Sequence, residues 1–98
     1  MTPVTRFFIL SNNIVIIAKS IGFEDGYELQ DPYMVYHNQG QVMLTPYLQD
    51  VIGQKAETIE IKNKDILTIT PAETKNDILQ SYLKQISGIE TGGELILG

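Results

Sequence analysis

Few residues of this chain could carry chemistry, and they are scattered. The one histidine, His37, has no cysteine or second histidine to join it, so a metal site would need three carboxylates from separate loops. We therefore interpret it as an ordinary residue at the end of a strand. Glu24 and Asp25 lie in a loop bounded by glycines and could hold a hard cation, but the spacing of a calcium loop is missing. A solvated acidic turn is the simpler interpretation of that pair.

Signatures of catalysis are also missing from the sequence. No serine, histidine and carboxylate are spaced as in a nucleophilic triad, and none of the 12 acidic residues stands out as half of an acid and base pair. Glycine does not occur in either of the two common phosphate-binding arrangements. The sequence therefore predicts a protein that is not an enzyme and that uses no cofactor.

Three tyrosines lie near turns and prolines, where a ring can be presented to a nucleic-acid base or to a partner protein: Tyr33, Tyr36 and Tyr47. Packing in the core or in a subunit interface is the alternative for each of them. The net charge is −5, and no segment concentrates Lys or Arg. Long-range attraction to nucleic acid is therefore not expected, and any contact with it must be local.

Composition and length limit the architecture that can position these residues. The 98 residues are 43% hydrophobic and 19% charged, which suits one packed domain over residues 1–88 followed by a tail over residues 89–98. We expect this tail to be mobile or to add an edge strand to the sheet. Cysteine is absent, so packing alone must hold the fold. The longest apolar run, residues 14–18, is far too short to cross a membrane. We expect a cytoplasmic protein without a membrane partner.

The alternation of apolar and polar residues predicts a mainly β fold. The expected strands cover residues 6–10, 14–20, 27–37, 58–61 and 67–70, and residues 41–44 are expected to form a fourth strand or to continue the third. Asn13 is expected to take the left-handed conformation in the first turn. Pro32 cannot donate a backbone hydrogen bond, so the third strand should be bent, bulged or at an edge there. Residues 48–56 carry weak signals and are expected to form a loop.

A change of pattern after the last strand predicts one helix. Thr70 is a suitable N-cap, Pro71 suits the first helical position, and Glu73 would complete a capping box. Apolar residues then follow one helical stripe from residue 78 to residue 86. We therefore expect a helix over residues 71–87, capped by Thr70 and docked on the sheet of its own subunit.

Two segments resemble the Sm-like (LSm) family of small, strongly bent, SH3-like β-barrels. Leu10-Ser11-Asn12-Asn13 and Asp31-Pro32-Tyr33-Met34-Val35 resemble the turn and the ending of the family's first motif, with Val35 where the family has asparagine. Ile61-Lys62-Asn63-Lys64-Asp65-Ile66 is similar to the start of its second motif, with Lys and Asn in place of Arg and Gly. The resemblance implies a strongly bent barrel whose copies assemble edge to edge into rings and commonly bind RNA.

The same resemblance implies an RNA-binding site. Carried over position by position, the site consists of Asp31, Tyr33, Lys62 and Asn63, with Tyr33 stacking on a base. Val35 cannot hydrogen-bond a base as the family's asparagine does, and lysine lacks the planar fork of arginine. We therefore expect weak, salt-sensitive contact with single-stranded RNA.

The chain also resembles the Sm-like proteins of tailed phages of marine cyanobacteria, in its acidic charge, its Asp-Pro-Tyr stretch and its Pro46-Tyr47 pair. This likeness implies a viral protein in the cytoplasm of the host cell. Residues 66–70 form a strand without guarding lysines or prolines, which favours a closed homo-oligomer. The expected function is a non-enzymatic ring subunit with weak RNA binding. The alternative is a structural or protein-interaction module of a phage without RNA binding.

Overall fold

The computed structural model describes residues 2–87, apart from the side chain of Asp50, and has a mainly β fold with a C-terminal helix, as predicted. The strands are β1 (Val4–Leu10), β2 (Val15–Phe23), β3 (Gly26–Asn38), β4 (Gln41–Pro46), β5 (Thr58–Lys62) and β6 (Ile66–Pro71). The helices are α1 (Gln49–Ile52), the 3-10 turn η1 (Asn63–Asp65) and α2 (Asp77–Ser87). The expected tail over residues 89–98 lies outside the described part of the chain.

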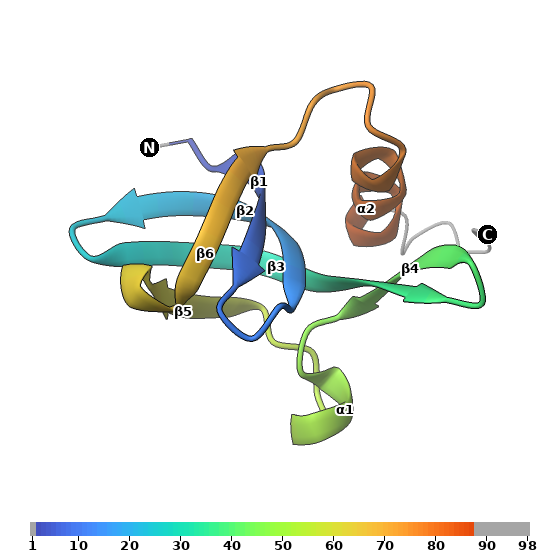
Figure 1. The fold of residues 1–98 in the computed structure, drawn as a ribbon, viewed down its shortest axis with the longest axis horizontal. Coiled ribbons are helices and arrows are strands. Elements are labelled where there is room, and N and C mark those ends of the chain that lie inside the picture. The colour runs from blue at the N-terminus through green and yellow to red at the C-terminus, as the bar shows by residue number, and fades with distance from the viewer. Residues whose placement is uncertain (1, 88–98) are drawn as a thin grey trace.

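The strands form one antiparallel sheet (Figure 1). Over residues 2–87 its order is β4-β3-β2-β1-β6, and β5 pairs with β3 as well. The long strand β3 pairs with β5 along its first part, from Gly26 to Gln30, and with β4 along its second part, from Tyr33 to Asn38. Within this described range β5 and β6 do not pair, so the sheet has the bend of a small barrel but is not closed.

A bulge lies in the middle of β3, as Pro32 predicts. The register between β2 and β3 shifts between Ile17, opposite Tyr33, and Lys19, opposite Gln30. Asp31 has a φ of 50°, and its N–H donates to the Glu57 carbonyl at 2.8 Å. Pro32 has no N–H to donate to the neighbouring strand. The bulge therefore interrupts the ladder at a position where one hydrogen bond would be missing in any case.

The turn between β1 and β2 has the predicted geometry. Asn13 has a φ of 70°, and the Asn12 side chain accepts a hydrogen bond from the Ile14 N–H at 3.1 Å. The Ser11 N–H donates to the Asp65 carbonyl at 2.9 Å, which ties this turn to η1. The turn is therefore fixed beside the end of β5.

The sheet carries a hydrophobic core on each face. The first core fills the inside of the bend and consists of Phe8, Leu10, Ile16, Ala18, Leu29 and Ile61. The second core lies under α2 and consists of Ile17, Tyr33, Leu79 and Tyr82. Neighbouring residues Ile16 and Ile17 belong to different cores because successive side chains of a strand point to opposite faces. The expected docking of the helix on its own sheet is confirmed.

The predicted start of the helix is wrong. Thr70 lies in β6, opposite Phe7, and the helix begins at Asp77. Its cap is Asn76, whose side-chain oxygen accepts a hydrogen bond from the Leu79 N–H at 3.0 Å. Pairing with β1 outcompetes the local capping pattern, and the Ala72 N–H still bonds to the Thr5 carbonyl at 3.2 Å.

The expected loop over residues 48–56 contains a single helical turn, α1. Leu48 and Gly53 flank it with left-handed φ angles of 67° and 77°. The turn projects from the body of the sheet below β4 (Figure 1).

Candidate functional site

The four residues predicted to bind RNA fall into two separate pairs. Asp31 lies beside Glu57, which precedes β5, whereas Lys62 is the last residue of β5 and pairs with Gly26. Five residues of extended strand separate these positions, which corresponds to roughly 16 Å. The structure therefore brings Asp31 together with Tyr33, and Lys62 with Asn63, but it does not join the two pairs into one pocket.

Tyr33 is a core residue. Its side chain is 5% exposed, and its ring meets that of Tyr82 edge to face at a centroid distance of 5.5 Å. Burial raises the pKa of the Tyr33 hydroxyl, and the nearby charge of Asp31 raises it further. A ring in this position has no free face on which a nucleic-acid base could stack.

Asp31 has a structural role beside it. Its carbonyl accepts a hydrogen bond from the Tyr82 hydroxyl at 2.8 Å. Its carboxylate lies 3.8 Å from the Lys55 ammonium, and both side chains are about one-third exposed. Such a half-exposed pair contributes little to stability. The backbone of Asp31 thus anchors the buried hydroxyl of α2 to the bulge of β3.

Lys62 and Asn63 lie beside the turn between β2 and β3. The Lys62 ammonium is 3.5 Å from the Asp25 carboxylate and 5.4 Å from the centroid of the Phe23 ring. The Asn63 N–H donates to the Asp25 carbonyl at 2.9 Å. Phe23 is 39% exposed, so an accessible aromatic ring and a cation lie side by side at this corner.

One glycine explains why this corner forms. A Cβ atom at Gly26 would lie 2.2 Å from the Ile61 carbonyl oxygen, so β5 can approach the start of β3 this closely only if residue 26 lacks a side chain. The glycine-bounded loop is visible in the sequence, which predicts a solvated acidic turn, and Glu24 and Asp25 are both exposed in the structure. Its contact with Lys62 and Asn63 depends on the pairing of β3 with β5, which local sequence does not reveal.

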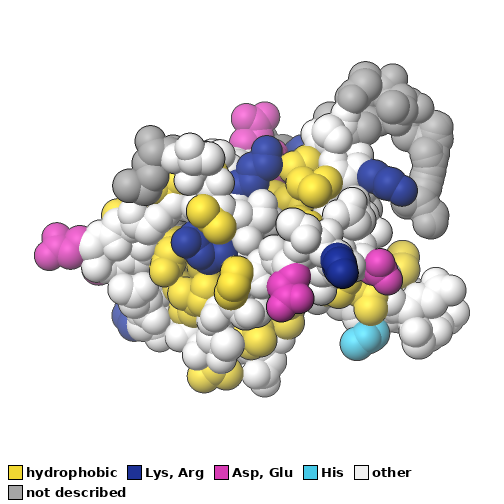
Figure 2. Space-filling model, turned by 90° about the horizontal axis from the view of Figure 1, so that it is seen from above, with side chains coloured by type: hydrophobic (Ala, Val, Ile, Leu, Met, Phe, Trp, Pro, Cys, Tyr) yellow, Lys and Arg dark blue, Asp and Glu magenta, His cyan; other side chains and the backbone are white. Residues whose placement is uncertain are grey.

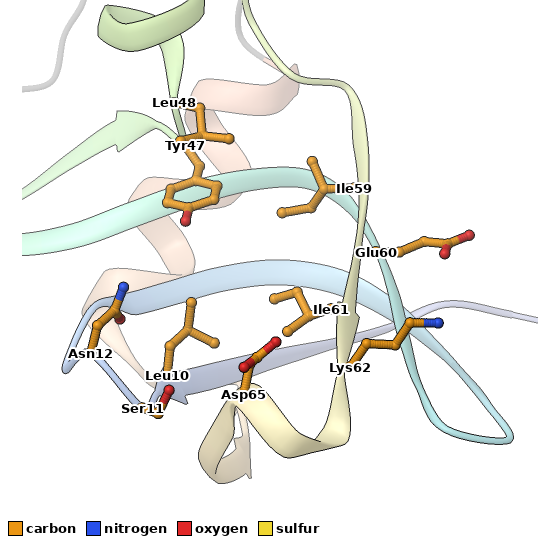
Figure 3. A pocket seen from close by; sticks show the side chains of 10 residues that line it. All are labelled: Leu10, Ser11, Asn12, Tyr47, Leu48, Ile59, Glu60, Ile61, Lys62 and Asp65. Carbon is orange, nitrogen blue, oxygen red and sulfur yellow. The ribbon is translucent and has the colours of Figure 1, made fainter.

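A groove of about 400 Å³ opens beside β5 (Figure 3). Its lining comes from the end of β1 and the turn after it, the segment after β4, β5 and η1: Leu10, Ser11, Asn12, Tyr47, Leu48, Ile59, Glu60, Ile61, Lys62 and Asp65. Leu10 and Ile61 belong to the first core and form an apolar floor. The volume falls in the range of known ligand pockets.

The groove runs along the side of β5 that faces away from β3. Ile59 and Ile61 point to one side of the strand, and Glu60 and Lys62 point to the other (Figure 3). Residues from both faces of β5 line the same groove. The groove therefore follows the side of β5 that is not paired with β3, where the two faces meet.

The sheet has unpaired strand sides at both ends, which we call open edges. Among residues 2–87, β6 bonds to β1 alone, and β4 and β5 bond to β3 alone. β6 has the sequence ILTITP, without a charge, and its Leu67 is 65% exposed. Natural sheets usually protect such an edge with charges or prolines inside the strand.

Three further kinds of feature can be compared with the described residues: metal-binding clusters, membrane-spanning helices and basic surface patches. Within residues 2–87 no group of three or more His, Cys, Asp or Glu side chains is placed to hold a metal ion. No helix in that range is long and apolar enough to cross a membrane. Lys and Arg side chains lie apart from one another on the face shown in Figure 2.

No protein-family model matches this sequence, and no curated protein is similar enough to match it.

Proposed function

We propose that this chain is a non-enzymatic subunit of a closed homo-oligomer, an Sm-like ring, in which β6 of one copy meets the β4 and β5 side of the next copy. The observation that carries the proposal is the pair of open edges at opposite ends of one sheet. Each edge offers backbone N–H and C=O groups to a second strand, and β6 has no charge to prevent such pairing.

Head-to-tail assembly follows from the difference between the two edges. A contact between unlike surfaces leaves one of each free on the growing assembly, so copies add head to tail. Such an assembly ends as a ring when the rotation between neighbours closes, and as a filament when it does not. The bend of the sheet supplies a rotation at every step, which favours closure.

The mass of the protein in solution tests the proposal. We expect light scattering at tens of micromolar protein to give a defined multiple of 11.0 kDa. Adding lysines to the exposed edge with Thr68→Lys and Thr70→Lys should give monomers, because each charge would have to be desolvated in the interface. Thr2→Lys with Thr74→Lys adds the same charge at exposed positions outside β6 and should leave the mass unchanged. A monomeric wild-type protein would contradict the proposal.

Weak binding of single-stranded RNA is a second function that one observation favours. Phe23 presents an exposed ring beside the Lys62 ammonium, and Asn63 lies next to it. An aromatic ring and a cation together can stack on a base and attract its phosphate. Repetition of this corner around a ring would add weak sites through effective concentration. The net charge of −5 per subunit opposes binding and keeps it weak. Affinity should fall as salt rises, because contacts between Lys62 and phosphate release counterions from the RNA.

Fluorescence anisotropy with labelled uridine-rich and adenine-rich oligonucleotides at low salt tests this function. Phe23→Ala should reduce binding by several fold, because stacking contributes about 1–3 kcal/mol per base. Tyr36→Ala is a matched control, since Tyr36 is 38% exposed and Phe23 is 39% exposed, and Tyr36 lies on the β3 and β4 hairpin. Absence of binding at high protein concentration, or equal loss in both variants, would favour a structural module without RNA binding.

A further inference from the structure

The groove beside β5 combines an apolar interior with a backbone edge. Its floor is formed by Leu10 and Ile61, and its walls include Tyr47 and Ile59, which pack on the same core. Among the charged lining residues, Glu60 and Lys62 point away from the interior, whereas the Asp65 carboxylate is directed toward it between Leu10 and Ile61 (Figure 3). An occupant that suits this groove is therefore apolar and belongs to an extended segment that can lie along the strand.

Leu67 has the complementary properties. It is the most exposed aliphatic residue in β6, at 65%, and it lies in the strand that forms the other open edge of the same sheet. A bulge explains its position, because the register between β1 and β6 shifts between Ile9, opposite Thr68, and Leu10, opposite Ile66. Leu67 is thus excluded from the ladder, and it is not part of the lining of the groove in its own chain.

We infer that the groove beside β5 of one copy receives the Leu67 side chain of the next copy. This inference rests on the proposed ring and names the side chain that fixes how neighbouring copies meet. A residue outside the ladder of its own sheet enters a groove with an apolar floor in the adjacent copy, so both apolar surfaces leave water. The bulge would be a device for pointing this side chain outward, which is a common role of bulges at sheet edges.

Charge favours a second copy as the occupant. The lining carries Glu60, Lys62 and Asp65, whose charges are of both signs, and β6 carries none. A segment without charge can approach these side chains without repulsion from either sign, and Glu60 and Lys62 can stay in water. A strongly basic or strongly acidic peptide would meet a like charge on one side of the groove.

Cysteine cross-linking tests the inference directly, because the natural chain has no cysteine. A tagged Leu67→Cys chain is refolded together with an untagged Tyr47→Cys chain, whose cysteine faces the interior of the groove, and mild oxidation should give a tagged and untagged dimer on a non-reducing gel. A disulfide needs the two Cα atoms within about 7 Å, so random collision in solution gives little product. Lys84→Cys replaces Tyr47→Cys in the control, since Lys84 is exposed on α2, which covers the other face of the sheet, and it should give no dimer.

A second measurement compares assembly of Leu67 variants. Leu67→Ala should raise the dissociation constant of the oligomer at least tenfold, and Leu67→Met, which keeps the volume, should change it little. The thermal stability of the separated subunit should be the same for both variants, because Leu67 is largely exposed within the chain.

The outcomes separate this inference from the proposed function. A wild-type protein that is monomeric overturns both. An oligomer that forms no link between residues 67 and 47, and whose dissociation constant is unchanged by Leu67→Ala, overturns the inference and leaves the ring. In that case soaking small apolar molecules or peptides into the groove would show whether it serves a different ligand.

Discussion

The two faces of the sheet differ in how completely they are covered. Helix α2 covers one face and buries Tyr82 completely, and the hydroxyl of that residue donates to the Asp31 carbonyl. On the other face the strands bend over the first core, but β5 and β6 do not meet within residues 2–87, and a groove stays open beside Tyr47.

This difference shows which part of the structure is complete within one copy. The core of the helical face is complete in this sense, because Ile17, Tyr33 and Leu79 pack with Tyr82 and the buried hydroxyl has a partner in the same chain. The groove and the open edges leave apolar surface and backbone groups available to another molecule. We therefore expect substitutions on the helical face to change folding and substitutions on the groove side to change assembly.

The largest effect should come from removing Tyr82. Tyr82→Ala removes a fully buried ring and leaves a cavity between α2 and the sheet, which typically costs about 3–5 kcal/mol in the free energy of unfolding. Tyr47→Ala removes a half-exposed ring from the wall of the groove and should cost only about 1 kcal/mol.

A urea titration of each variant at low protein concentration measures this contrast. Low concentration matters because assembly would add stability that does not belong to the single chain. Equal losses for the two tyrosines would break the distinction between a complete face and an incomplete one.

A second prediction concerns alkaline pH. Burial raises the pKa of the Tyr82 hydroxyl well above its usual value, and burial also raises the pKa of the Tyr33 hydroxyl. Above about pH 10 the unfolded chain therefore loses these protons while the folded chain keeps them, so stability falls as pH rises. The limiting slope is about 1.4 kcal/mol per pH unit for each such tyrosine.

Tyr82→Phe isolates this effect. The variant should be less stable than wild type at pH 7, because the Asp31 carbonyl loses its donor, and should lose less stability between pH 10 and pH 11. Tyr36→Phe, in which an exposed ring is changed, should keep the wild-type slope. If Tyr82→Phe kept that slope too, the hydroxyl of Tyr82 would not be the group that titrates.

Much of the fold was readable from the sequence because alternation and turn residues act locally. The expected strands, the left-handed Asn13 and the irregularity at Pro32 are all confirmed. The sequence did not predict which residues of β3 share a face of the sheet. Leu29 and Tyr33 are four residues apart and would share a face of a regular strand, yet the bulge puts them in different cores. A sequence shows where a bulge is needed but not how it turns the residues that follow.

The candidate site was predictable only in fragments. Lys62 and Asn63 were named, but Phe23 and Asp25, which they contact, were not joined to them. That contact depends on the close approach of Gly26 and Ile61, a pairing across more than 30 residues of chain that no local pattern encodes. Tyr33 was named for a base-stacking role, and its burial under α2 does not suit that role.

The smallest expected effect concerns the start of α2, on which the cover of the helical face depends. The Asn76 side chain accepts the Leu79 N–H, one of the donors that a helix leaves without a partner in its first turn. Asn76→Ala should therefore cost about 1 kcal/mol, measured by urea titration. Asn76→Asp should retain the stability, because a carboxylate accepts the same hydrogen bond and suits the positive end of the helix dipole.

Thr70→Ala is the informative comparison for this cap. The capping box in the sequence predicts that Thr70 carries the cap, whereas in the structure Thr70 is an exposed residue of β6 opposite Phe7. The variant should therefore lose only the modest strand preference of threonine, about half a kcal/mol or less. A loss for Thr70→Ala as large as that for Asn76→Ala would mean that the helix begins before Asp77, and residues 71–76 would then lengthen the cover over the second core.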